Sequence, residues 1–139
     1  MGEIRFDTGV KSYSLNGCCE VAFNPTDSSF AEKLSRVLSQ LDGMQERMSR
    51  ELAEAGDGGQ LFELSRRYDR QMREKLDGLF DRPICEALFG DMNVYALAGG
   101  LPVWANLLLA LLDEAGESLR REQKLTDPAL EKILAKYRA

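Results

Sequence analysis

Residues 27–80 decide the fold, and they read DSSFAEKLSRVLSQLDGMQERMSRELAEAGDGGQLFELSRRYDRQMREKLDGLF. From Phe30 to Ala55 apolar side chains recur every three or four residues, which is the spacing of an amphipathic helix. A second apolar stripe of the same kind runs over residues 60–80. Because a four-residue, glycine-rich loop (56–59) separates the two stripes, the sequence predicts an antiparallel helical hairpin.

The start of the first helix is marked by helix-breaking and capping residues. Residues 24–27, with the sequence NPTD, cannot easily continue a regular element. Ser29, followed three residues later by Glu32, has the form of a capping box. We therefore expect the first helix to cover about residues 27–55 and the second to cover about residues 60–80.

The first 24 residues have the pattern of a β-hairpin. Tyr13 and Leu15 alternate with serines, and the alternation resumes after the turn signal Asn16-Gly17. A two-residue loop (16–17) and a three-residue loop (15–17) both fit this pattern. We favour the three-residue loop, with its glycine left-handed, because it gathers apolar residues on one face. These residues are Tyr13, Cys19, Val21 and Phe23.

Shorter elements are expected on either side of the helical hairpin. Ile4 and Phe6 are candidates for a third short strand in the N-terminal sheet. Residues 84–89 are expected to form a short helix that ends at Gly90, and Gly99-Gly100 is expected to form a turn.

The last part of the chain is expected to contain two separate helices. The first begins at Pro102, has apolar residues on two flanks, which predicts deep burial, and stops near Gly116. Residues 117–139 are rich in charge, and Asp127-Pro128 has the form of a helix start. This final helix is a candidate for ordering on a partner.

Together these patterns predict an α+β fold that is mainly α. A short N-terminal β-hairpin is followed by an antiparallel helical hairpin and further packed helices. We expect a single domain over residues 1–139, since its length is within the usual range of one domain. It divides into the β-hairpin (1–24), a helical core (27–116) and the charged C-terminal helix (117–139), which is a candidate for a mobile segment.

The composition argues against several classes of function. The chain has 139 residues, is 44% hydrophobic and 29% charged, and has a net charge of −5. It has no histidine, which excludes Ser-His and Cys-His nucleophiles and histidine metal ligands. Because the net charge is negative, binding to nucleic acid is disfavoured.

The sequence also lacks features of secretion and membrane insertion. Its start has no apolar run after a basic segment, so no secretory signal is expected. The strongest apolar stretch (101–112) contains Asn106 and is shorter than the ~20 residues that span a bilayer. Three cysteines without a framework spacing fit a reducing compartment. We therefore expect a cytoplasmic protein without a membrane partner.

No set of residues has the spacing of a catalytic or metal site. Cys18 and Cys19 are adjacent, whereas metal and redox sites typically use a C-x-x-C spacing that lets two thiolates converge. We expect them to be buried or half-buried structural cysteines. Calcium and phosphate-binding loop motifs are absent from the sequence. The sequence therefore predicts a protein that is not an enzyme and has no catalytic, cofactor-binding or metal-binding residues.

Three further features have a functional and a structural interpretation. Arginines at positions 66, 67, 70 and 73 could bind phosphate, but nearby acidic residues favour a solvated or interhelical charged face. Methionines at positions 44, 48 and 72 could form an adaptable binding surface, but filling of the core is favoured. Trp104 could anchor a partner, and burial against the helical hairpin is again favoured.

Two short motifs in a fixed order carry a resemblance to a known family. The β-hairpin closes at Phe23-Asn24-Pro25, and after the long helices the sequence CEALFG (85–90) precedes an apolar helix. This order resembles the small tail-assembly proteins of long-tailed bacteriophages and of prophages of Gram-positive bacteria. The resemblance covers roughly residues 12–114, and the acidic C-terminal helix departs from the family pattern.

The resemblance implies a non-enzymatic, chaperone-like function in tail assembly. Such a protein forms homo-oligomers and binds the tape-measure protein, or another tail protein, which it keeps soluble until the tail tube forms. The family has no catalytic residues to transfer. Our own candidates for partner-binding residues are Leu61, Tyr68, Met72, Leu130, Ile133 and Tyr137. The alternative hypothesis is a small helical adaptor or regulatory protein that binds a single host or phage protein.

Overall fold

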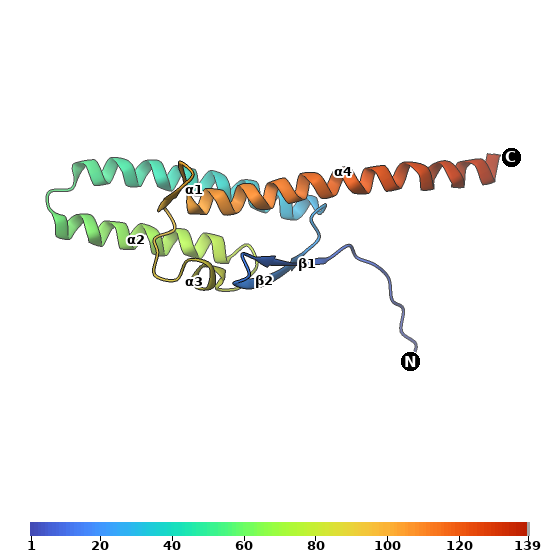
Figure 1. Cartoon of the computed structure of the whole chain (residues 1–139), viewed down its shortest axis with the longest axis horizontal. Helices are drawn as coiled ribbons and strands as arrows, with labels where there is room; N and C mark the ends of the chain where they lie inside the picture. The colour runs from blue at the N-terminus through green and yellow to red at the C-terminus, as the bar shows by residue number, and fades with distance from the viewer. Residues whose placement is uncertain (139) are drawn as a thin grey trace.

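The computed structural model describes the backbone of residues 1–138 and the side chains of residues 1–123. The predicted fold class is confirmed, because a short antiparallel β-hairpin precedes a mainly helical body (Figure 1). The elements in chain order are β1 (Lys11–Leu15), β2 (Cys19–Phe23), α1 (Ser28–Glu54), α2 (Gly58–Asp77), α3 (Ile84–Phe89), β3 (Leu97–Ala98), β4 (Leu101–Pro102) and α4 (Val103–Arg138).

The helical hairpin of α1 and α2 forms as predicted, but the loop between them is shorter than expected, because Gly58 and Gly59 already belong to α2. Aspartates cap both helices. The Asp27 carboxylate accepts a hydrogen bond of 3.0 Å from the Ser29 backbone N–H. The Asp57 carboxylate accepts one of 2.9 Å from the Gln60 N–H. The predicted Ser29–Glu32 capping box is wrong, because Ser29 already lies inside the helix and Asp27 is the residue with extended backbone that begins it.

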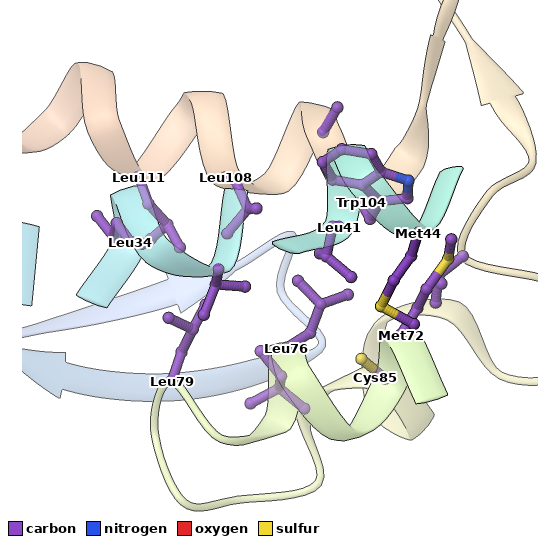
Figure 2. Packing of buried hydrophobic residues seen from close by; sticks show 14 of the residues in the cluster. Leu34, Leu41, Met44, Met72, Leu76, Leu79, Cys85, Trp104, Leu108 and Leu111 are labelled. Atoms are coloured by element: carbon purple, nitrogen blue, oxygen red, sulfur yellow. The ribbon is translucent and has the colours of Figure 1, made fainter. Parts of the chain in front are cut away.

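The core lies where α4 covers the α1–α2 hairpin (Figure 2). Trp104 and Leu108 of α4 point toward Leu41 of α1, and Met72 and Leu76 of α2 complete the layer from below. Complete burial of each such side chain stabilises the fold by about 1.5–3 kcal/mol. The structural interpretations are confirmed, since Trp104 and the methionines at positions 44, 48 and 72 are all buried.

The β-hairpin presents the predicted face to the helices. Tyr13 pairs with Val21 and Leu15 with Cys19, so the favoured face is confirmed. The loop itself is shifted by one residue to positions 16–18, because Asn16 and Gly17 both adopt positive φ (52° and 69°) and Leu15 still belongs to β1. The rings of Phe23 and Phe30 stack at 4.4 Å and hold the hairpin against the start of α1.

Residues 1–10 form an extended N-terminal arm that projects away from the body (Figure 1). The predicted third strand is wrong, since Ile4 and Phe6 are 90% and 79% exposed and the arm pairs with neither β1 nor β2. The physical reason is direction, because the arm continues outward from β1 instead of reversing to lie along it.

Helix α4 is one continuous helix, which corrects the prediction of two separate helices. It passes through Gly116 because a glycine inside a helix costs only about 1 kcal/mol. The predicted start at Asp127-Pro128 is also wrong, since Pro128 lies inside the same helix. A proline there removes its own backbone donor at a cost of about 3 kcal/mol, which a long helix can tolerate. Figure 1 shows that α4 extends well past the rest of the molecule.

Candidate functional site

An open apolar groove lies beside β1, and we call it the β1 groove. Its walls are the end of β1, the end of α3 with the loop that follows, and the first turns of α4. Its volume is about 500 Å³. The apolar side chains that line it include those of Leu15, Leu88, Phe89, Met92, Leu107 and Ala110. None of the described lining residues is titratable, so the groove can bind an apolar segment but offers no acid–base chemistry.

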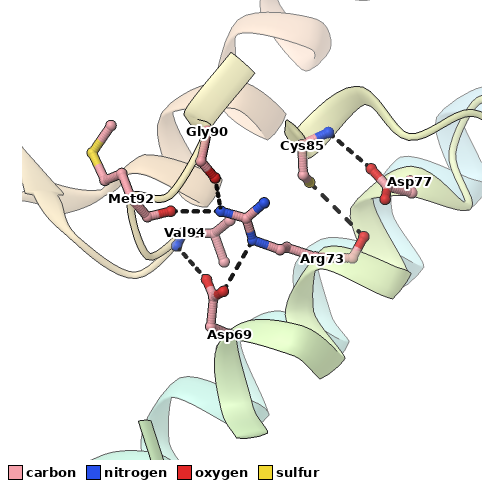
Figure 3. Close-up of polar contacts among 7 residues, drawn as sticks. All are labelled: Asp69, Arg73, Asp77, Cys85, Gly90, Met92 and Val94. Atoms are coloured by element: carbon pink, nitrogen blue, oxygen red, sulfur yellow. Dashed lines mark hydrogen bonds and ion pairs between the residues drawn. The ribbon is translucent and has the colours of Figure 1, made fainter. Parts of the chain in front are cut away.

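An arginine–aspartate pair on α2 fixes the loop that forms one wall (Figure 3). The Arg73 guanidinium donates hydrogen bonds of 2.7 Å to the carbonyl oxygens of both Gly90 and Met92. Asp69 accepts a bond of 3.0 Å from Arg73 and one of 2.8 Å from the Val94 N–H. Because these groups are partly buried and charged, the bonds are stronger than those between neutral groups, and the loop is held in place.

A second set of hydrogen bonds fastens the β3–β4 hairpin to α4. The backbone N–H of Trp104 donates to the Val94 carbonyl at 3.0 Å, and the Asn106 side chain donates to the Ala98 carbonyl at 3.0 Å. The turn between β3 and β4 is Gly99-Gly100, as predicted, with positive φ at both positions. These bonds define the edge of the groove at Ala98.

The remaining wall is held by a polar network between β1 and α4. Glu114 Oε1 accepts hydrogen bonds from the Tyr13 hydroxyl (3.0 Å), the Ser118 hydroxyl (3.1 Å) and Arg121 (3.1 Å). Burial alone would raise the pKa of Glu114, but these hydrogen bonds outweigh it and lower the pKa below its usual value. The pKa of Tyr13 is raised, mainly by burial and secondly by the hydrogen bond to Glu114. The network therefore favours an ionised Glu114 and a protonated Tyr13.

The predicted partner-binding residues do not form this groove. Tyr68 and Met72 are 5% and 0% exposed, so both belong to the core and have almost no free surface for a partner. Leu61 is half-buried near the start of α2, away from β1. The side chains of Leu130, Ile133 and Tyr137 lie outside those that the structure describes.

The groove residues were missed because they come from three separate elements. The apolar helix predicted from Pro102 had two apolar flanks, and Leu107 lies on one of them. These two apolar flanks were the only feature of the sequence that indicated the groove. Met92, in contrast, lies in an irregular loop where no periodic pattern exists.

The other candidate residues have mainly structural surroundings. Arg67 forms an ion pair of 3.5 Å with Glu51, which confirms an interhelical charged contact. Cys85 is buried and Cys19 is half-buried, but Cys18 is exposed, so its predicted burial is wrong. Cys18 is exposed because it belongs to the turn of the hairpin.

Burial and the nearby Asp77 carboxylate raise the pKa of the Cys85 thiol, which keeps it protonated and unreactive. Among the residues that the structure describes, no three His, Cys, Asp or Glu side chains form a group that could hold a metal ion. The described helices also include none that combines the length and apolarity needed to cross a membrane.

Comparisons of the chain with protein-family models, curated proteins and solved structures found no match. The β1 groove and the order of the sequence motifs are therefore the basis for a functional proposal.

Proposed function

We propose that this chain is a non-enzymatic, chaperone-like protein of phage or prophage tail assembly. It binds an apolar segment of the tape-measure protein, or of another tail protein, in the β1 groove, and it self-associates during tail morphogenesis. The observation that carries the proposal is an open, mainly apolar groove of about 500 Å³ whose walls are held by hydrogen bonds and whose described lining has no titratable residue. This volume is within the range of about 300–1,000 Å³ that is typical of ligand sites.

The chemistry of the groove suits a chaperone better than a highly specific receptor. Most of its lining side chains are apolar, with Ser14, Asn16 and Asn106 as the polar ones, so binding depends mainly on removing apolar surface from water and not on one exact sequence. Met92 is 47% exposed at the groove, and the flexible thioether of methionine adapts to differently shaped side chains. A protein of this kind acts in the host bacterial cytoplasm, where a long partner is synthesised.

The tail-specific part of the proposal is supported by the order of the sequence motifs. The alternative, a helical adaptor that binds one protein, uses the same groove but needs no partner of unusual length. The genes beside the coding frame distinguish the two hypotheses. A tail-tube gene and a very long helical frame support tail assembly, and metabolic or regulatory neighbours support the adaptor.

The experiment is co-expression with the product of the very long helical frame that the tail-assembly hypothesis places beside this gene. We expect the wild-type chain to increase the soluble yield of that protein severalfold, and Ala110→Arg to remove the gain, because Ala110 lines the groove and is exposed. Ala53→Arg is the matched control, since Ala53 is an exposed α1 residue outside the groove. No gain with the wild-type chain, or equal loss with both variants, would overturn the proposal.

A further inference from the structure

The N-terminal arm has the side-chain pattern of a strand with one buried face. In residues 3–10, EIRFDTGV, the even positions hold Ile4, Phe6, a threonine and Val10, so three of the four are apolar. Charged residues occupy the opposite face, at positions 3, 5 and 7. This period of two is typical of a strand that covers an apolar surface. In the structure the apolar face is uncovered, with Ile4 90% and Phe6 79% exposed.

The free edge of β1 is a suitable acceptor for such a strand. β1 pairs with β2 along one edge, and the described part of the chain places no strand on its other edge. The outer side of β2 is occupied, because Arg82 donates a hydrogen bond to the Glu20 carbonyl and α3 packs nearby. The end of β1 borders the β1 groove through Ser14 and Leu15. A strand added there would direct alternate side chains into the groove.

The arm is held in a direction that takes it away from its own groove. It leaves the body at Lys11, at the opposite end of β1 from the turn that borders the groove, and it projects outward (Figure 1). The Asn24 side chain donates a hydrogen bond of 2.9 Å to the Thr8 carbonyl. The same amide lies 2.6 Å from the position that a Cβ at Gly9 would occupy, so Asn24 packs closely against the point where the arm would have to reverse.

We propose that residues 3–8 of a second copy of this chain add as a strand to the free edge of β1 and place Ile4 and Phe6 in the β1 groove. This inference rests on the proposed function, because it names the occupant of the same groove before a partner arrives. The outward face of the added strand carries Glu3, Arg5 and Asp7, which remain in water. An arriving partner would then displace the arm, so self-association and partner binding exclude each other at one groove.

The test is a mixing experiment with two variants, measured by light scattering. The arm variant Ile4→Asp/Phe6→Asp and the groove variant Ala110→Arg change exposed residues, so both are expected to keep the wild-type circular dichroism spectrum. We expect the wild-type chain to have at least twice its monomer mass and each variant alone to be a monomer. An equimolar mixture is expected to form a dimer, since the groove variant supplies an intact arm and the arm variant supplies an intact groove. Ala53→Arg is expected to associate like the wild type.

Three results would overturn the inference: a monomeric wild-type chain at high concentration, an arm variant that associates like the wild type, or a mixture that stays monomeric. These results are independent of the co-expression experiment. A monomeric wild type that still increases the soluble yield of the long helical protein would overturn the arm proposal alone. Association that follows the mixing pattern without any increase in yield would overturn the proposed function alone.

Discussion

The hydroxyl of Tyr13 donates a hydrogen bond of 3.0 Å to Glu114 and thereby joins β1 to α4 across 101 positions of sequence. The ring of Tyr13 also stacks on Phe23 at a centroid distance of 4.8 Å. The hydroxyl of Tyr13 therefore contacts α4, and its ring contacts β2. Because β1 forms one wall of the β1 groove and α4 forms another, this bond links two walls of the groove.

Tyr13→Phe is expected to lower the free energy of unfolding by about 1–2 kcal/mol, because it removes a hydrogen bond to a charged group and keeps the ring. Urea unfolding measures the change. Tyr95→Phe is the matched control, since the hydroxyl of half-buried Tyr95 forms no hydrogen bond with the described residues, and its effect is expected to be within about 0.5 kcal/mol. Equal effects of the two substitutions would show that the Tyr13 bond does not stabilise the fold.

Acid is expected to weaken the contact between β1 and α4. The folded-state pKa of Glu114 lies below its ordinary value of 4.5, so its contribution to stability is complete above that value. The contribution is lost as the pH falls through the lower, folded-state pKa. The free energy of unfolding of Glu114→Gln should therefore lie below that of the wild type near neutral pH and approach it as the pH falls below 4.5. A difference that is constant with pH would contradict this assignment.

The elements that sequence analysis predicted correctly are those with local signals. The apolar stripe of α1, the Asn-Pro-Thr-Asp breaker before it and the glycine-rich segment after it each lie within a few residues of the feature that they specify. The face of the β-hairpin was predictable for the same reason, because alternation alone decides which side Tyr13 and Val21 share.

The errors arose where distant parts of the chain decide the outcome. Gly116 is a helix terminator by local preference, but packing of α4 on α1 around Leu111 and the burial of Ser118 keep the helix intact. Met72 looked available for a partner because the sequence does not reveal that other helices cover its side of α2. The β1 groove could not be predicted, since its walls come together only after the whole chain has folded.

Arg73→Ala is expected to lower the free energy of unfolding by about 2–3 kcal/mol. The substitution removes the donors to the carbonyl oxygens of Gly90 and Met92 and leaves Asp69 without its ion-pair partner. The amide hydrogen of Val94, which donates to Asp69, should also exchange faster. Arg70→Ala on the same helix is the control, because Arg70 is exposed, and it should change stability by about 0.5 kcal/mol or less.

Two methionine substitutions distinguish the structural role of a core methionine from the binding role of a groove methionine. Met72→Ala is expected to destabilise the fold by about 2–5 kcal/mol, since Met72 is fully buried and the substitution leaves a cavity. Met92→Ala should change stability by about 0.5 kcal/mol or less, because Met92 is 47% exposed, but it should reduce the soluble yield of the co-expressed partner. Urea unfolding and the co-expression assay together measure both effects. A Met92→Ala chain with full chaperone effect would argue that the partner does not contact this wall.

Gly116→Ala is expected to stabilise the protein by about 0.5–1 kcal/mol, because Gly116 lies inside α4 and alanine restricts the unfolded chain more than glycine does. The added Cβ would meet Arg120 Nη1 at 3.6 Å, which is an ordinary contact. Gly17→Ala is the opposite case, since Gly17 has a φ of +69° and the substitution should destabilise by about 1 kcal/mol despite open space. Thermal unfolding followed by circular dichroism measures both changes. A loss of stability in Gly116→Ala would mean that α4 is interrupted at this position, as the local sequence pattern alone suggests.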